Sequence, residues 1–407
     1  MGSMRTRQTL IPTVGRAYEE SHPWIDFRVD LRRASPDVWM LLGEARSKIA
    51  HIAGSLLNPE VAREMHIVYL AKGMLATTAI EGNTLSEEEA RKRVEGDLDL
   101  PPSREYLGRE IDNILTAFNR IKDELVEGAA PPMSRPTIEN FNRLILEGLQ
   151  LDEGVMPGRI PTHRVAVGGY PGAPREDCEF LLEQLSDWLN GPDFVPPARD
   201  WELPMAIVKA IVAHLYIAWI HPFGDGNGRT ARMMELRILL EAGVPTPATH
   251  LLSNHYNQTR TEYYRQLREA SKGDGDILPF VRYALQGFVD GLHEQLDTIR
   301  TQQFADRWEQ YVYQQFGRTT TTARMRQRQL VLEMSKADVG PWSRRELRAL
   351  SSGLVEMYHG KTDKTLTRDV NALLSMELIR ATPGGGYVPN KQIIEAFRPV
   401  TVSQGEG

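Results

Sequence analysis

Cysteine, excess positive charge and long apolar segments are all scarce in this chain of 407 residues. A single cysteine, Cys178, excludes an internal disulfide framework and is typical of a reducing cytosol. The formal net charge of −6 gives no sign of a protein that binds nucleic acid over its whole surface. We identify no apolar run of membrane-spanning length and no apolar N-terminal signal segment. We therefore expect a protein of the cytoplasm without a membrane partner.

The length is sufficient for two or three domains, and the composition is that of an ordinary soluble protein. Apolar residues recur at helical spacing in several segments, for example over 36–53, which predicts a mostly helical fold. The Gly-, Arg- and Thr-rich segment 317–325 is typical of a linker. We predict five parts: an arm over 1–35, a helical region over 36–155, a core over 156–316, this linker, and a small domain over 326–400.

The segment 221–232 has the sequence HPFGDGNGRTAR, in which glycine occupies every second position from 224 to 228. Glycine lets the backbone approach a ligand closely. The apolar run 207–220 before it predicts a buried helix, and 233–242 predicts another. A glycine-rich loop that opens a helix exposes backbone N–H groups at the positive end of the helix dipole. The pattern therefore predicts an anion site.

The side chains of this loop suit a phosphate ligand. Arg229 and Arg232 are charge-assisted donors, and Asp225 offers the hard oxygen that Mg²⁺ prefers. His221 titrates near neutral pH and is the candidate general base. A plain loop with solvated charges is the alternative, but a histidine, an acid, an asparagine and two arginines within twelve positions favour a functional site. The segment does not match the P-loop pattern GxxxxGK[ST] or a dinucleotide fingerprint.

The same segment resembles the Fic-family motif HxFx(D/E)GNGRxxR and matches it at every fixed position. The resemblance implies a mostly helical enzyme that moves AMP from ATP onto a protein hydroxyl. It implies His221 as the base and Asp225 as the ligand of Mg²⁺. It also implies an anion hole at Gly226, Asn227 and Gly228. The residues of the loop implied to contact the nucleotide are Asp225, Gly226, Asn227, Gly228, Arg229, Thr230, Ala231 and Arg232.

A second motif lies upstream, at 77–82. Thr77 and Glu81 are four positions apart and share one helix face, and Gly82 ends the helix. An ordinary capped helix end with a solvated glutamate is one interpretation. The segment also resembles the inhibitory motif (S/T)xxxE(G/N) of Fic proteins. That resemblance implies that Glu81 reaches into the nucleotide site and pairs with Arg232.

Short β-branched runs around a Gly-Gly turn predict a β-hairpin in 159–171. In Fic proteins a hairpin flap before the core helices clamps the target peptide by strand addition. The resemblance places Val167, Gly168, Gly169 and Tyr170 beside the nucleotide. A surface hairpin without a partner is the alternative.

A tyrosine pair, Tyr263 and Tyr264, follows the loop at a distance seen in Fic proteins. The resemblance implies that Tyr263 lines the adenine pocket and that Ser271 contacts the base. The alternative is that the tyrosines pack in the core, above all Tyr264.

Beyond the predicted linker, helices over 326–334, 343–350 and 362–376 precede a strand, a glycine turn and a strand over 379–388. This order resembles a winged helix with 362–376 as its recognition helix. Three cations, Lys361, Lys364 and Arg368, could contact phosphates, whereas Glu356, Asp363 and Asp369 dilute their charge. DNA binding through 343–390 and a protein–protein or dimerisation role both stay open.

The predicted fold class is all-α: a Fic-type helical bundle with a short β-hairpin flap, followed by a small winged-helix (α+β) domain. The leading function is a Mg²⁺- and ATP-dependent protein adenylyltransferase, autoinhibited by Glu81. It would transfer AMP to a Ser, Thr or Tyr hydroxyl of a target protein docked on the flap, and self-modification stays open. Another nucleotide donor or removal of AMP are close alternatives. A nucleotide-sensing winged-helix transcription regulator is the alternative from another class.

Overall fold

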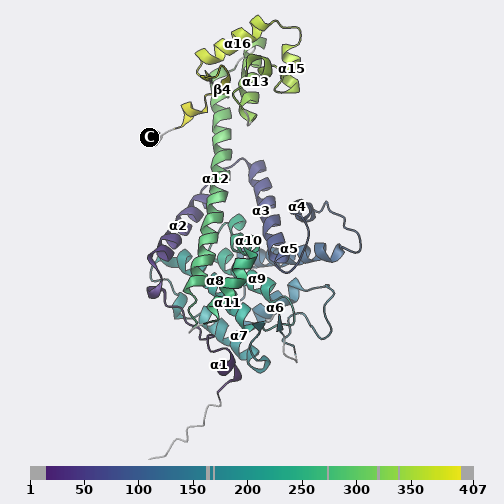
Figure 1. Ribbon diagram of the computed structural model, residues 1–407, viewed down its shortest axis with the longest axis vertical. Helices are drawn as coiled ribbons and strands as arrows, with labels where there is room; N and C mark the ends of the chain where they lie inside the picture. The colour runs from purple at the N-terminus through teal and green to yellow at the C-terminus, as the bar shows by residue number, and fades with distance from the viewer. Residues whose placement is uncertain are drawn as a thin grey trace, which may run out of the picture. The chain divides into compact units, whose positions relative to one another are not determined.

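The computed structural model describes residues 15–161, 166–167, 170–272, 275–318, 321–337 and 340–395, with the backbone alone at 166, 167 and 170. The chain divides into an N-terminal unit, 1–297, and a C-terminal unit, 298–407 (Figure 1). The division falls inside helix α12 (Leu278–Phe316) and not in the predicted linker 317–325. Part of that linker is helical, because α13 begins at Thr322 and the Thr321 hydroxyl caps it.

The N-terminal unit is built almost wholly from helices. The predicted helical region, 36–155, and the part of the predicted core region 156–316 that ends at 297 belong to this one unit. The predicted arm contains a short helix and is held to the unit by the Arg16–Asp177 ion pair. The helices are α1 (Ala17–Ser21), α2 (Pro36–Ala53), α3 (Pro59–Ala79), α4 (Glu87–Glu95), α5 (Glu105–Val126), α6 (Arg135–Ile145), α7 (Arg175–Leu189), α8 (Glu202–Ile220), α9 (Asn227–Glu241), α10 (Leu251–Gln258), α11 (Arg260–Ala270) and the first part of α12.

Helix α8 forms the centre of this unit. Its residues from Ile207 to Ile220 are almost all buried, and it packs against α9, α7 and α2 (Figure 1). By length and composition alone, the helical stretch Arg199–Ile220 could cross a membrane, so the expectation that no run reaches that length is wrong. Most of this stretch is buried inside the unit, which is the environment of a core helix.

A two-stranded hairpin lies where the sequence predicts one. Strand β1 (Ala166–Val167) pairs antiparallel with β2 (Tyr170–Pro171). The predicted turn residues Gly168 and Gly169 lie outside the described residues. Immediately after β2, the amide of Ala173 donates to the carbonyl of Ile220 at 3.0 Å. The chain leaving the hairpin is therefore fastened to the end of α8, where the 221–232 loop begins.

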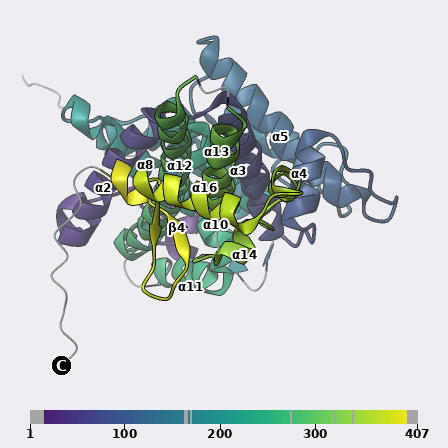
Figure 2. The same ribbon diagram turned by 90° about the horizontal axis from the view of Figure 1, so that it is seen from above.

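The C-terminal unit combines helices with a second hairpin (Figure 2). Its core includes Trp308, Leu330, Leu354, Val370 and Leu378. The helix predicted over 343–350 is shorter, and the segment after it forms a helix of its own. The elements after α12 are α13 (Thr322–Lys336), α14 (Arg344–Leu347), α15 (Ser352–Tyr358), α16 (Asp363–Ser375), β3 (Ile379–Ala381) and β4 (Tyr387–Pro389). Strands β3 and β4 are antiparallel, and Trp342 adds an isolated bridge to Tyr387. The fold is thus mostly helical, with a small C-terminal hairpin.

Candidate active site

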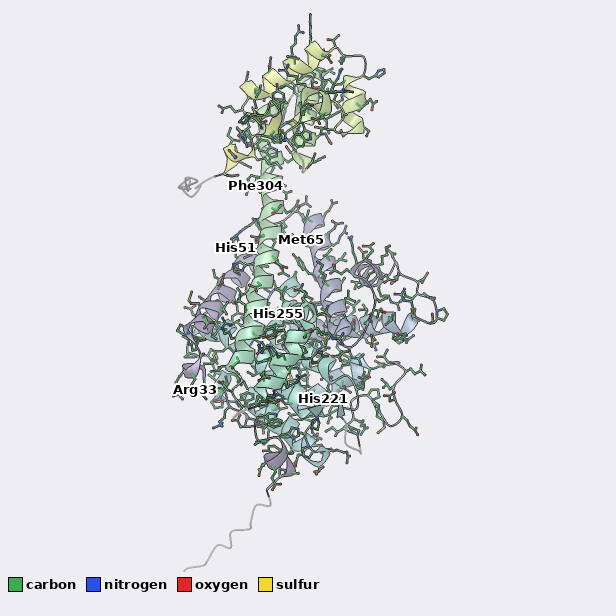
Figure 3. The ribbon with its side chains drawn as sticks, in the orientation of Figure 1. Arg33, His51, Met65, His221, His255 and Phe304 are labelled. Atoms are coloured by element: carbon green, nitrogen blue, oxygen red, sulfur yellow. The ribbon has the colours of Figure 1, made fainter. Side chains whose placement is uncertain are left out.

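The loop between α8 and α9 turns sharply and opens α9 without a side-chain cap. His221 follows α8 with φ 51°, and Gly226 precedes α9 with φ 76° and no capping side chain. The first amide groups of a helix have no carbonyl partner within it, so the start of α9 can receive an anion. Figure 3 labels His221 in the N-terminal unit. Gly172, beside the hairpin, comes so close that a Cβ on it would lie 2.8 Å from His221 Cβ.

Hydrogen bonds within the loop and from α6 hold this shape. The Asn227 side chain accepts from the Phe223 amide at 2.9 Å and donates to the Phe223 carbonyl at 2.7 Å. The oxygen and the nitrogen of the Asn227 side chain are thus both engaged within the loop. Asn142 of α6, fully buried, donates to the Asp225 carbonyl and accepts from the Gly158 amide, at 2.9 and 2.8 Å. Sequence reasoning missed Asn142, which the amphipathic pattern of α6 does not distinguish.

Two of the predicted nucleotide contacts face the protein interior. Thr230 and Ala231 are completely buried. The Thr230 amide and hydroxyl both donate to the Gly226 carbonyl at 2.8 Å. Helical spacing turns these two side chains toward the core while Gly228, Arg229 and Arg232 face the site. Their contacts with a nucleotide stay predictions.

His221 has the electrostatics of a base. Burial lowers its pKa, and this effect outweighs a hydrogen bond to the Ala218 backbone and the charges of Glu81 and Asp225, which raise it. The imidazole is therefore neutral at pH 7 and able to accept a proton.

Arg232 is the most deeply buried cation of the site. It is 1% exposed, and its Nη2 donates to the Thr77 carbonyl at 2.8 Å and to Glu81 Oε1 at 2.5 Å. Its Nε and Nη1 are buried without a hydrogen-bond partner. Burying unpaired donors is costly, so this guanidinium can still accept an anionic ligand. The Glu81–Arg232 pair implied by the resemblance is present.

Glu81 lies over the start of α9. A Cβ placed on Gly228 would clash with Glu81 Oε1. Burial raises the pKa of Glu81, but the adjacent Arg232, with Arg229 and His221, outweighs it and the net pKa is lowered. The carboxylate is thus ionised at the end of the helix that favours anions. Thr77 contributes its carbonyl, since its hydroxyl bonds to Gly73 within α3 at 2.9 Å.

Arg229 is held by two carboxylates. It is 4% exposed and donates to Glu110 at 2.8 Å and to Asp225 at 3.0 Å. Glu110, from α5, also accepts from Asn83, one residue beyond the 77–82 motif. Burial raises the pKa of Glu110. Sequence reasoning missed Glu110 and Asn83, because a glutamate on an amphipathic helix gives no local sign of its partner.

Asp225 fits the role of a Mg²⁺ ligand. Its side chain is 46% exposed, and one oxygen accepts from the Gly226 amide at 2.5 Å. Across the described part of the chain, no three His, Cys, Asp or Glu side chains lie together as a metal site. Mg²⁺ commonly takes one or two carboxylates and completes its shell with phosphate and water. Asp225 with a bound nucleotide would provide that set.

The two tyrosines of the pair differ in burial, and it is Tyr263, not Tyr264, that lies in the core. Tyr263 is 3% exposed and hydrogen-bonds His214 Nε2 at 2.8 Å, whereas Tyr264 is 42% exposed. His214 Nδ1 in turn faces buried Glu235 at 3.1 Å. Core packing therefore applies to Tyr263 and not to Tyr264. Ser271 is partly exposed and bonds to the Arg268 carbonyl at the end of α11.

These features define a helical domain in which a buried arginine with unused donors lies near the junction of α8 and α9. Residues 132–239 match the Fic/DOC family, so the chain contains a Fic/DOC family domain. The match begins before the predicted core boundary at 156, and so includes α6, whose Asn142 holds the loop.

Several known proteins are similar to this chain. Protein adenylyltransferase fic-1 of Caenorhabditis briggsae is 31% identical over 262 residues, covering 63% of this chain and 46% of that protein. Protein adenylyltransferase Fic of Nematostella vectensis is 30% identical over 261 residues, covering 62% and 56%. The alignment thus spans about half the length of these curated relatives. The chain is distantly related to protein adenylyltransferases.

Two solved structures share the fold. A Fic family protein from Desulfovibrio desulfuricans G20 aligns with a TM-score of 0.52 at 21% identity, covering 89% of this chain and 98% of that one. A Fic-1 fragment from C. elegans aligns with a TM-score of 0.50 at 26% identity, covering 65% and 73%.

Proposed function

We propose that this chain is a Mg²⁺- and ATP-dependent protein adenylyltransferase whose resting state is inhibited by Glu81. The observation that carries the proposal is Arg232, which is buried at the start of α9. One of its nitrogens is paired with Glu81 and two are without a partner. A buried guanidinium with unused donors at a helix N-terminus is suited to bind a polyphosphate. Distant relationship to protein adenylyltransferases supports the same activity.

In the proposed reaction a hydroxyl oxygen of the target attacks the α-phosphorus of ATP. A bond forms between that oxygen and phosphorus, and the bond from phosphorus to the oxygen bridging to the β-phosphate breaks, so that pyrophosphate leaves. Neutral His221 accepts the hydroxyl proton. Asp225 would hold Mg²⁺, which supplies positive charge against the departing pyrophosphate. The backbone at the start of α9 and Arg232 orient the phosphates, since positioning and charge stabilisation dominate this chemistry.

The inhibition follows from where the Glu81 carboxylate lies. It contacts both Gly228 at the first turn of α9 and the Arg232 guanidinium. A phosphate that requires these groups must displace it. ATP would then bind weakly, or with its α-phosphate turned away from in-line attack.

The target protein would dock on the hairpin within 159–171. Strands β1 and β2 form a two-stranded sheet, and an added target strand could pair with its edge. The chain leaving β2 is fastened to the end of α8. A target strand on the hairpin would therefore be close to His221.

The proposal is tested by incubating wild type, Glu81→Gly and Glu81→Gly/His221→Ala with radiolabelled ATP and a host lysate. We expect label on protein with Glu81→Gly, weak label with wild type, and none with the double variant. UTP and CDP-choline in parallel test another donor, and previously modified protein tests AMP removal. Absence of label from ATP in the Glu81→Gly sample would refute adenylyltransfer.

A further inference from the structure

The two units carry charge of opposite sign. Residues 298–407 contain 16 Lys and Arg against 11 Asp and Glu, a formal charge of +5. Because the whole chain has a charge of −6, residues 1–297 carry −11. The overall charge hides this difference. Charge asymmetry between parts of a chain points to a polyanionic partner for the basic part.

Helix α16 presents a polar face that is free of acidic side chains. Lys364, Arg368, Asn371 and Ser375 are all exposed, at intervals of four, three and four residues. This spacing places them on one side of the helix. Apart from Asp369, the buried side is apolar and packs into the core of the unit. None of the exposed large apolar side chains found in the described residues belongs to α16, so this face lacks the apolar anchors of a protein interface.

Two of the three acids that dilute the charge in the sequence, Asp363 and Asp369, do not lie on this face, and the third, Glu356, belongs to α15. Asp369 is 2% exposed and accepts from Arg326 at 2.6 and 3.1 Å and from the Tyr358 hydroxyl at 2.9 Å. Its charge is therefore compensated inside the unit. Asp363, at the start of α16, is paired with Arg348 at 2.7 Å.

The surrounding elements present α16 as a recognition helix. The Arg348 guanidinium also donates to the carbonyls of Lys361 and Tyr358, at 2.6 and 3.4 Å, and so fixes the turn between α15 and α16. The β3–β4 hairpin packs beside α16 (Figure 2). A winged helix has the same order of elements: a helix, a turn, an exposed helix and a hairpin. The 13 residues of α16 extend about 20 Å, and a helix fits the major groove, which is about 12 Å wide.

We propose that the exposed face of α16 binds the major groove of duplex DNA. Lys364 and Arg368 supply the positive charge, and Asn371 supplies an amide that can pair with an adenine edge. This activity is separate from nucleotide transfer and does not depend on it.

The experiment measures fluorescence anisotropy of a labelled 24-base-pair duplex with the full chain at several KCl concentrations. We expect wild type to bind and to weaken as salt rises. Each phosphate contact contributes about 0.9 to the slope of log K against log salt. Two contacts therefore raise the binding constant at 0.1 M salt about 60-fold above its value at 1 M salt. Lys364→Glu/Arg368→Glu should therefore lose at least about 60-fold.

The matched control is Arg32→Glu/Arg120→Glu, which changes the net charge equally at exposed positions of the N-terminal unit. Its affinity should change less than about threefold, because neither arginine belongs to the unit that carries α16 and the change in net charge is the same. Circular dichroism melting establishes that both variants are folded. The proposal is overturned if wild type does not bind duplex at 50 mM KCl, if both variants lose affinity equally, or if single-stranded DNA binds as tightly. A dimer of wild type that Lys364→Glu/Arg368→Glu separates, with no DNA binding, would assign the face to protein contact instead.

Discussion

Replacing Glu81 with glycine removes the carboxylate that pairs with Arg232, and this change should activate the enzyme. The pair is joined at 2.5 Å, with the Arg232 side chain 1% and the Glu81 side chain 31% exposed. A hydrogen bond between charged groups contributes about 1.5–3 kcal/mol when sheltered. In Glu81→Gly an incoming phosphate does not have to break this hydrogen bond. We therefore expect transfer from ATP to rise about 10- to 150-fold in single-turnover assays, at about 1.4 kcal/mol per tenfold.

The same substitution should destabilise the protein without nucleotide. It leaves Arg232 buried and unpaired, which costs about 3–5 kcal/mol for a fully buried pair. Because Glu81 is about one-third exposed, we expect about 2 kcal/mol, or about 4–8 °C in Tm at about 2–4 °C per kcal/mol. ATP should restore part of this loss, since it binds the folded state. Differential scanning fluorimetry with and without ATP measures both effects.

A double-mutant cycle with Arg232→Ala tests whether the two residues act through each other. Arg232→Ala should lower transfer even when Glu81 is absent, because the phosphates have lost their anchor. Glu64→Gly, at an exposed position of the same helix α3, is the control and should not activate. Additive effects of Glu81→Gly and Arg232→Ala, or equal activation by Glu64→Gly, would refute the reasoning.

Three further predictions concern the loop. His221→Ala should abolish transfer while the calorimetric Kd for ATP changes little, because a base acts in the transition state. Since burial lowers the pKa of His221, wild-type activity should be level at pH 7–8 and decline only below the ordinary histidine pKa of about 6.5. Asp225→Ala should lose both activity and the Mg²⁺ dependence of ATP binding in calorimetric titrations, and unchanged metal-linked binding would assign the ligand elsewhere. Asn142→Ala should lower the free energy of unfolding by about 2–4 kcal/mol in urea denaturation, since it leaves buried loop groups unpaired. Asn140→Ala on the same helix should cost less than about 1 kcal/mol, and equal losses would show that Asn142 does not hold the loop.

Local patterns in the sequence were sufficient to predict the elements that carry the site. The apolar run before 221 predicted the helix observed as α8, and the alternating glycines predicted the loop that opens α9. Gly82 marked the end of the helix that presents Glu81, and the Gly-Gly turn marked the β1–β2 hairpin. These signals are local, because helical period, positive φ and turn chemistry involve residues within a few positions of one another.

Only the tertiary structure decided which polar side chains serve the site. Asn142 meets Asp225 across 83 positions, and Glu110 meets Arg229 across 119. Before packing, each is one polar residue on an amphipathic helix, with no sign of whether it faces solvent or another element. Asp369 shows the converse, since an acid that appears in the sequence to weaken a basic face is buried against Arg326. Partners of this kind are set by how helices pack, and packing depends on the whole chain.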